Sequence, residues 1–287
     1  MNGTMVSDGG SNGADPIGGS AKPSTSIAGI SNADVRLQIK DGTVIVDNGM
    51  NERKTILDHV DLAVRAGEFV TVLGGNGAGK STLFNVVSGT LPLTRGQVLI
   101  NGRDVTHESE VARASSVARV FQDPKMGTAP RMSVAENLLL ALRRGRRRRV
   151  RPRDLDAHRE RFRELCAGIG NGLEEHLDTP AGNLSGGQRQ ALSLIMATIE
   201  EPDLLLLDEH TAALDPKTSK QLMRITAEKI KQSHLTCLMI THRMDDALVY
   251  GDRLIVMSKG GIARDLDREQ KRELTMPDLL QFFEDGF

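Results

Sequence analysis

Apolar and polar residues alternate in two segments of the amino-terminal half, residues 35–39 and residues 60–64. Successive side chains of a strand point to opposite faces, so this alternation predicts half-buried antiparallel strands. A hairpin is predicted over residues 97–105, because the Asn101-Gly102 pair supplies the positive φ angles of a two-residue turn. An antiparallel β-layer should therefore open the domain.

Four later segments are continuously apolar or nearly so: residues 69–73, 204–207, 236–240 and 254–257. Short apolar runs separated by helical patterns are typical of parallel strands that are buried on both faces. Strand patterns disappear in the inserted stretch between them, and residues 133–200 predict a helical subdomain. The predicted fold class is α/β, with a central parallel sheet, an antiparallel β-layer and an inserted helical lobe.

The two ends of the chain differ from its middle. Residues 1–33 are rich in Gly, Ser, Asn and Asp with few large apolar residues, which predicts a disordered tail. They lack the basic start and apolar stretch of a signal peptide, so export is not expected; a misassigned start site is the alternative. Residues 266–287 predict a short helical extension with no sensing function. Its expected anchors are Leu279, Leu280, Phe282 and Phe283.

Composition argues against several classes of protein. The 287 residues are 39% hydrophobic and 26% charged, and no run approaches the roughly 20 apolar residues of a membrane-spanning helix. The net charge of −1 gives no basic surplus for a phosphate backbone, so nucleic acid is not an expected partner. Cys166 and Cys237 lie far apart without a metal-site spacing, which favours reduced thiols in a cytoplasmic protein.

A glycine-rich segment follows the apolar run at 69–73 and precedes a helical pattern that starts near Lys80. It fits the G-x-x-x-x-G-K-[ST] phosphate loop, whose backbone N–H groups and helix amino-terminus attract phosphates. We expect Lys80 to reach the β- and γ-phosphates and Ser81 to bind Mg²⁺. The predicted nucleotide-binding residues here are Gly74, Gly75, Asn76, Gly77, Ala78, Gly79, Lys80, Ser81 and Thr82.

Two carboxylates, Asp208 and Glu209, come directly after the apolar run 204–207. The carboxyl ends of parallel strands open onto the ligand site in such sheets, which brings the pair to the predicted phosphate site. We expect Asp208 to hold Mg²⁺ and Glu209 to polarise the attacking water, since one carboxylate cannot fill both roles. Without the phosphate loop, the pair would be interpreted as a solvated strand end.

A second anion-binding helix start lies about a hundred residues after the first. Its sequence, Leu184-Ser185-Gly186-Gly187-Gln188, resembles the signature motif of ATP-binding-cassette proteins. The resemblance spans roughly residues 34–265, the expected nucleotide-binding domain, and implies nucleotide contacts from residues 185–188. In that family two subunits meet head to tail, and each ATP lies between the phosphate loop of one and the signature motif of the other.

Three further residues match landmarks of that family, each a weak signal by itself. Gln122 resembles the glutamine-loop residue that couples the Mg²⁺ site to the transporter-facing lobe, and His242 resembles the histidine that contacts the γ-phosphate. Asp215 resembles the loop residue that joins the two nucleotide sites across the dimer. The resemblance implies catalytic roles for Glu209, His242 and Gln122, and Mg²⁺ ligation by Ser81, Gln122 and Asp208.

The resemblance implies an ATP-hydrolysing transporter subunit, and a stand-alone cassette favours import. A cytoplasmic homodimer would dock on the inner face of the cell membrane through permease subunits, with a solute-binding protein as an indirect partner and ATP and Mg²⁺ as cofactors. Residues 208–211 and 121–128 resemble import ATPases paired with aromatic-amino-acid-type binding lipoproteins. Two alternatives remain open: a soluble cassette ATPase that acts as an assembly scaffold, and a nucleotide-binding module that does not hydrolyse.

The early strands depart from the family pattern. No aromatic residue precedes Phe69, whereas most family members place one there against adenine. Val44, Ile45 or Val46 could supply an apolar contact without π-stacking, which predicts weaker selection for adenine.

Two other features leave alternatives open. His210 stands where the family commonly has proline; it could titrate near neutral pH and alter Glu209, or be a solvated or hydrogen-bonded bystander, which we favour. The arginine run at 143–153 could contact permease loops or anionic lipid headgroups, or form a solvated charged face. We favour the solvated face, because acidic residues return from Asp154 onward.

Overall fold

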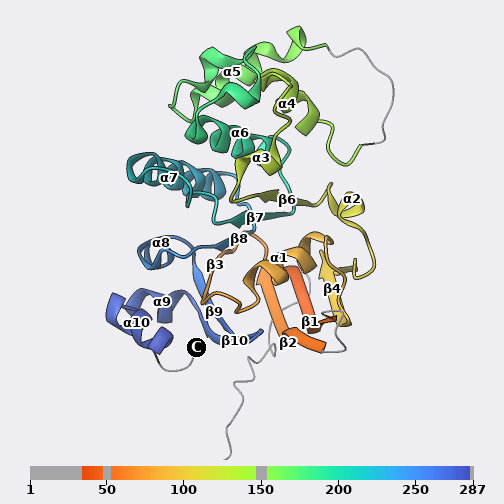
Figure 1. The fold of residues 1–287 in the computed structure, drawn as a ribbon, viewed down its shortest axis with the longest axis vertical. Coiled ribbons are helices and arrows are strands. Elements are labelled where there is room, and N and C mark those ends of the chain that lie inside the picture. Colours follow the sequence, from red (N-terminus) through yellow and green to blue (C-terminus); the bar gives the residue numbers. More distant parts are fainter. Residues whose placement is uncertain (1–33, 48–52, 147–153, 285–287) are drawn as a thin grey trace, which may run out of the picture.

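The computed structural model describes residues 34–47, 53–146 and 154–284 (Figure 1). The tail expected at 1–33 lies outside these residues, as does the arginine run from residue 147 to 153. Within the described ranges, no helix has the length and apolarity needed to cross a bilayer.

The antiparallel layer is a four-stranded sheet with the order β2-β1-β4-β5. Its strands are β1 (Val35–Asp47), β2 (Arg53–Arg65), β4 (Arg95–Ile100) and β5 (Arg103–Asp104). All of its strand pairs are antiparallel, as the alternating pattern predicts. At the β4–β5 turn, Asn101 and Gly102 have φ angles of 52° and 73°, which confirms the predicted hairpin.

The central sheet has six strands in the order β10-β9-β3-β8-β7-β6. Its strands are β3 (Phe69–Gly74), β6 (Val117–Val120), β7 (Leu204–Asp208), β8 (Cys237–Ile240), β9 (Arg253–Ser258) and β10 (Gly261–Leu266). Neighbours are parallel except β9 and β10, which confirms the parallel strands predicted from the apolar runs. The sequence did not predict β6 or β10, because charged residues interrupt their apolar pattern: Arg119 in β6, and Arg264 and Asp265 in β10.

The first helix, α1 (Lys80–Ser88), packs between the two sheets. Leu83 and Phe84 of α1 are fully buried and share one core with Leu37 of β1 and Val72 of β3. This contact fixes the helix start at the carboxyl end of β3, where the glycine-rich loop lies. Two short helices, α2 (Glu110–Arg113) and α3 (Pro124–Gly127), flank β6.

A helical lobe lies beyond β6 and β7, at the opposite end of the molecule from the antiparallel layer (Figure 1). It contains α4 (Val134–Ala141), α5 (Arg159–Ala167), α6 (Gly186–Thr198) and the short 3₁₀ turns Asp156–His158, Leu173–His176 and Ala181–Asn183. Its buried residues, such as Phe162 and Leu192, form a second core with Leu205 and Leu207 of β7. The long helix α7 (Pro216–Gln232) covers the same core.

The remaining helices are α8 (Met244–Val249), α9 (Arg268–Glu273) and α10 (Met276–Glu284). Leu279 of α10 is fully buried against Leu73 and Val256, and Phe282 packs on the same cluster, as predicted. Leu280 is 47% exposed, so its expected anchoring role is wrong; it lies on the outer face of an amphipathic helix. The side chain of Phe283 lies outside the described part of the chain.

Candidate active site

The glycine-rich loop joins β3 to α1, as the sequence predicts. Gly74 and Gly79 have φ angles of 157° and 100°, which side chains rarely adopt. A Cβ atom at Gly74 would lie 2.5 Å from the carbonyl oxygen of Met257, and one at Gly79 would lie 2.9 Å from Leu57. Glycine is therefore required at both positions, and the loop runs tightly against β9 and β2.

Lys80 begins α1 and is only 6% exposed. Its Nζ donates hydrogen bonds to the carbonyl oxygens of Gly74 and Gly75, at 2.7 and 3.0 Å. Burial lowers the pKa of Lys80, while the negative charges of Glu209 and Asp208 act in the opposite direction. The ammonium group thus lies over the loop and within the field of the two predicted acidic residues.

Asp208 ends β7 and forms an ion pair with Arg119 of β6, with 2.5 Å between Nη2 and Oδ2. The same guanidinium donates to Asn85 Oδ1 at 2.7 Å and lies over the ring of Phe121, 4.8 Å from its centroid. Both charged side chains are mostly buried, at 12% and 14% exposed. Arg119 therefore fixes the orientation of the Asp208 carboxylate relative to α1.

Arg119 is not among the site residues predicted from the sequence. A signal was present, because Arg119 is the single charged residue in the four-residue segment 117–120, which is otherwise apolar. A charged side chain in a buried strand needs a partner, and a neighbouring strand that ends in carboxylates can supply one.

Glu209 and His242 meet at the carboxyl ends of the neighbouring strands β7 and β8. Glu209 Oε1 lies 2.5 Å from His242 Nε2, and the two side chains are 11% and 45% exposed. The backbone N–H of Glu209 donates to the carbonyl oxygen of Ile240 at 3.0 Å. The backbone of Glu209 lies in the left-handed region, at a φ angle of 47°. Non-glycine residues in this region are uncommon and cluster at functional sites, so the strain is consistent with a positioned carboxylate.

His210 is buried behind Glu209, at 2% exposed. Burial lowers its pKa to about 4, so the ring is neutral at physiological pH and does not titrate there. Its Nε2 lies 3.3 Å from Thr226 Oγ1, and Thr226 in turn donates to the carbonyl oxygen of Leu222. His210 is thus a hydrogen-bonded packing residue, as we favoured.

Gln122 follows β6 and is exposed, in the linker to α3. The linker is tied to α6: Gln190 Nε2 donates to the carbonyl oxygen of Phe121 at 3.0 Å. Arg189 Nε donates to Thr128 Oγ1 at 2.7 Å, on the other side of α3. The segment that contains Gln122 is therefore held by the helix that begins with the signature motif.

The signature motif caps α6. Ser185 is the N-cap residue, its Oγ accepts from the N–H of Gln188, and the Gln188 side chain accepts from the N–H of Ser185. Ser185, Gly186, Gly187 and Gln188 line one open hollow of about 400 Å³ together with Asp215, which caps α7. None of residues 74–82 lines this hollow. One chain therefore carries the two predicted halves of a nucleotide site in separate places.

The chemistry of the donor set fits Mg²⁺. Ser81, Asp208 and Gln122 offer a hydroxyl, a carboxylate and an amide oxygen, which are hard oxygen ligands. Ser81 lies at the start of α1 after β3, Asp208 ends β7, and Gln122 follows β6. All three therefore lie at the carboxyl edge of the central sheet. Among the described residues, no group of three or more His, Cys, Asp or Glu could hold a metal ion. This is compatible with Mg²⁺, which usually combines one or two carboxylates with substrate phosphates and water.

Residues 57–212 match the family model of ABC transporter ATP-binding domains. The chain belongs to this family. It is 42% identical over 248 residues to a tyrosine transport ATP-binding protein of Clostridioides difficile (strain R20291), covering 86% of this chain and 98% of that protein. It is 35% identical to the aliphatic sulfonates import ATP-binding protein SsuB 1 of Nocardia farcinica (strain IFM 10152), covering 80% and 83%.

Solved ABC cassettes have the same fold. The dimeric post-hydrolysis structure of the cassette MJ0796, bound to ADP and Pi, aligns with a TM-score of 0.70 at 26% identity and covers 81% of this chain and 98% of that one. The ADP conformation of the ABC cassette MJ1267 also aligns with a TM-score of 0.70 at 26% identity, covering 87% and 98%. These relatives establish the α/β fold and ATP binding, and ATP hydrolysis is characteristic of the family.

One of the three residues expected to contact adenine is wrong. Val44 is 2% exposed and belongs to the core between the sheets, so it cannot contact adenine. Ile45 and Val46 are 40% and 43% exposed and remain available. Register shifts between Ile39 and Val44 in the β1–β2 pairing bring Val44 opposite Leu57, on the inward face of β1.

The described part of the arginine run is not uniformly solvated. Arg144 is half-buried and donates hydrogen bonds to the carbonyl oxygens of Met196, Ala197 and Glu200, at the end of α6. Burial lowers its pKa. The prediction of a solvated face is therefore wrong for Arg144. The carbonyl groups at the end of α6 lack partners within the helix, and Arg144 takes the place of water as their donor.

Proposed function

We propose that this chain is the ATP-hydrolysing subunit of an importer for an aromatic amino acid, acting through separate permease subunits and a solute-binding protein. The observation that carries the proposal is the 42% identity to the tyrosine transport ATP-binding protein along 98% of that protein. Import subunits named for sulfonates and polyamines are less similar, at 35% and 34%. The working protein would then lie at the inner face of the membrane, attached through the permease.

In the proposed reaction, Glu209 accepts a proton from the water that attacks the γ-phosphate of ATP. Its contact with His242 Nε2 holds the carboxylate at the edge of the sheet, and the exposed part of His242 is available to the γ-phosphate. Lys80 exchanges the carbonyl oxygens of Gly74 and Gly75 for phosphate oxygens, because a charged acceptor forms the stronger hydrogen bond.

Ser81, Gln122 and Asp208 would hold Mg²⁺, which neutralises charge on the β- and γ-phosphates when bound. Arg119 occupies one oxygen of Asp208 and thereby directs the carboxylate. The linker that contains Gln122 is tied to α6 through Gln190, so a displacement of this linker would reach the signature motif.

A complete nucleotide site requires a second copy of the chain. Residues 185–188 and Asp215 line a hollow without the phosphate loop, so they would contact the ATP that is bound by the partner copy. Two copies arranged head to tail would enclose two ATP molecules. The dimeric MJ0796 cassette supports this arrangement.

The test is reconstitution of the chain with the membrane proteins that co-purify with it, together with its solute-binding protein, in vesicles. ATP-driven uptake of labelled tyrosine is the expected result. Glu209→Gln should lower both ATP hydrolysis and uptake by about a hundredfold or more, since it removes the proton acceptor. The matched control is Glu228→Gln on the exposed face of α7, which should leave both rates unchanged.

Three outcomes would contradict parts of the proposal. Uptake of another solute but not tyrosine would refute the substrate. Full ATPase activity in a soluble assembly without any membrane partner would favour the scaffold alternative. Unchanged hydrolysis in Glu209→Gln would refute the role of Glu209.

A further inference from the structure

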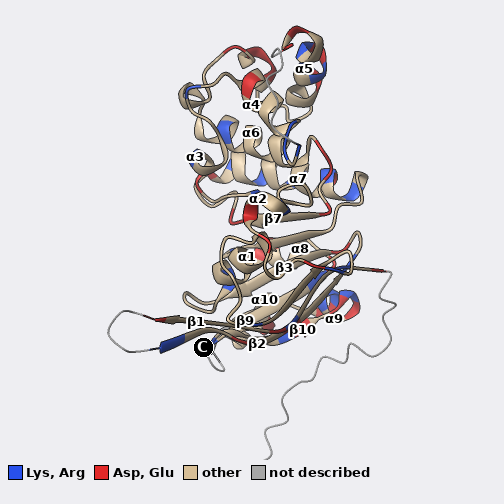
Figure 2. Ribbon diagram, turned by 90° about the vertical axis from the view of Figure 1, so that its right-hand side faces the viewer, with Lys and Arg blue, Asp and Glu red and all other residues tan. Residues whose placement is uncertain are grey.

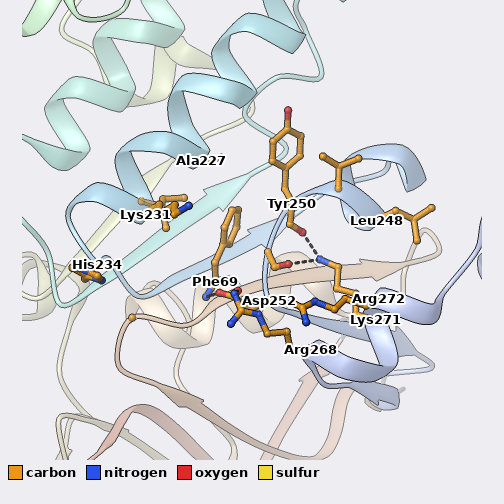
Figure 3. Close-up of a pocket in the computed structure, with 14 residues that line it drawn as sticks. Phe69, Ala227, Lys231, His234, Leu248, Tyr250, Asp252, Arg268, Lys271 and Arg272 are labelled. Atoms are coloured by element: carbon orange, nitrogen blue, oxygen red, sulfur yellow. Dashed lines mark hydrogen bonds and ion pairs between the residues drawn. The ribbon is translucent and has the colours of Figure 1, made fainter.

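A second hollow lies at the opposite end of β3 from the phosphate loop (Figure 3). Phe69, at the start of β3, lines this hollow, and Gly74 ends β3 at the phosphate loop. The length of β3 therefore separates the two sites by about 16 Å. Its volume of about 480 Å³ lies within the range of small-molecule sites. It is lined by the end of α7, the residues before β9, and α9, so it includes the carboxyl-terminal extension.

The lining of the hollow is rich in cations. Lys231 comes from α7, and Arg268, Lys271 and Arg272 come from α9. Among the described residues of the lining, Asp252 is the only carboxylate. Asp252 is already engaged, since Oδ1 pairs with Arg268 at 3.1 Å and Oδ2 accepts from the N–H of Phe69 at 3.3 Å. The lining therefore has a positive excess, although charges of both signs are interspersed along α9 (Figure 2).

Lys271 is the buried member of this group, at 5% exposed. Its Nζ donates to the backbone carbonyl oxygens of Tyr250 and Gly251 (Figure 3), and no carboxylate of the described chain lies within salt-bridge distance. Burial lowers its pKa to about 8, while the negative charge of Asp252 acts in the opposite direction. A buried ammonium group with only neutral acceptors gains stability when an anion approaches, because a charged acceptor compensates the lost hydration better than a carbonyl does.

The lining also contains an apolar group of residues. It is formed by Ala227 and Ile230 of α7, Leu248 and Val249 of α8, and the ring of Tyr250. Val249 is 72% exposed, a large apolar surface for a residue beside charged groups. Gly67 in the same lining leaves space, since a Cβ there would have only the carbonyl oxygen of His234 within 4 Å, at 3.6 Å.

We propose that this hollow binds an organic anion, a carboxylate or phosphate carried on an apolar body. The anionic group would lie among Lys231, Lys271 and Arg272, and the apolar body would lie against Val249 and Tyr250. Such a ligand would tie α9 to α7 and to the amino-terminal ends of β3 and β9. The site is separate from ATP hydrolysis, and its existence does not depend on the transported solute.

The test is calorimetric titration of the full chain with phenyl phosphate, in saturating Mg-ADP so that the phosphate loop is filled. Saturable one-site binding is expected, weakened by added salt. Arg272→Gln and Lys231→Met should each raise the Kd about tenfold by removing a charged donor. The control is Arg163→Gln in the helical lobe, an equally charged exposed position, which should leave the Kd unchanged.

Phenol and inorganic phosphate separate the two parts of the site, and each should bind more weakly than phenyl phosphate. The proposal is overturned by an absence of saturable binding, by a Kd that Arg272→Gln and Lys231→Met leave unchanged, or by an equal loss in Arg163→Gln. Equal binding of phenol would refute the role of the cations. Lys231 and Arg272 are exposed, so their substitution should leave the fold intact. Thermal unfolding of the ligand-free variants checks this.

Discussion

At the scale of single residues, burial decides the behaviour of His210. Its pKa is lowered from 6.5 to about 4, so below pH 6.5 the unfolded chain takes up a proton that the folded chain does not. The folded state is therefore destabilised as pH falls from 6.5 towards 4, by about 3 kcal/mol in total. We expect His210→Gln to remove this part of the pH dependence in urea unfolding.

The comparison uses His107→Gln, which changes an exposed histidine. This control should keep the loss of stability between pH 6.5 and 4. The aspartates with lowered pKa values, such as Asp104 and Asp215, lose their contribution only at pH values near or below 3.8. An unchanged pH profile in His210→Gln would contradict the assignment.

Arg119 offers a second test at this scale. Arg119→Met retains an apolar stem but leaves the mostly buried Asp208 without its charged partner. The free energy of unfolding should fall by about 2 kcal/mol in the absence of nucleotide, measured by urea unfolding. Arg103→Met, which breaks an exposed pair with Glu108, should have a much smaller effect. Equal losses in the two variants would show that Arg119 has no special role.

At the scale of elements, α6 joins the site to the helical lobe. It begins at the Ser185 cap, and Arg144 donates hydrogen bonds to the carbonyl oxygens at its end. A cation at a helix carboxyl-terminus also complements the helix dipole. Arg144→Met should lower the free energy of unfolding by about 1–2 kcal/mol, measured by chemical denaturation. Arg146→Met, at an exposed position nearby, should change it little; a larger loss there would refute the capping role.

At the scale of the whole molecule, the two predicted halves of the nucleotide site lie apart in one chain. With Mg-ATP, Glu209→Gln should accumulate as a dimer, because the proposed dimer would bind ATP between two copies and this variant would not hydrolyse it. Light scattering after size-exclusion chromatography would measure this. Adding Lys80→Met should return the protein to monomers, since it removes a phosphate contact. A monomer in Glu209→Gln at saturating Mg-ATP would contradict the shared site.

The sequence by itself determined the sheet strands with regular patterns, the hairpin at Asn101-Gly102, and the phosphate loop. These features are local: alternation, turn chemistry and glycine spacing act within a few residues. It also placed Glu209 and His242 at the ends of strands. The carboxyl ends of parallel strands open onto the ligand site, which predicted Glu209 near the phosphates. The direct contact between Glu209 and His242 was not predicted.

Only the tertiary structure decided which distant residues meet. The Arg119–Asp208 pair joins residues 89 positions apart, and Arg144 reaches carbonyl groups 52 or more positions away. Val44 turns inward because of a register shift that no local pattern announces. Burial, and with it the neutral state of His210 and the cationic hollow at Lys271, depends on packing between separate elements, which sequence periodicity does not encode.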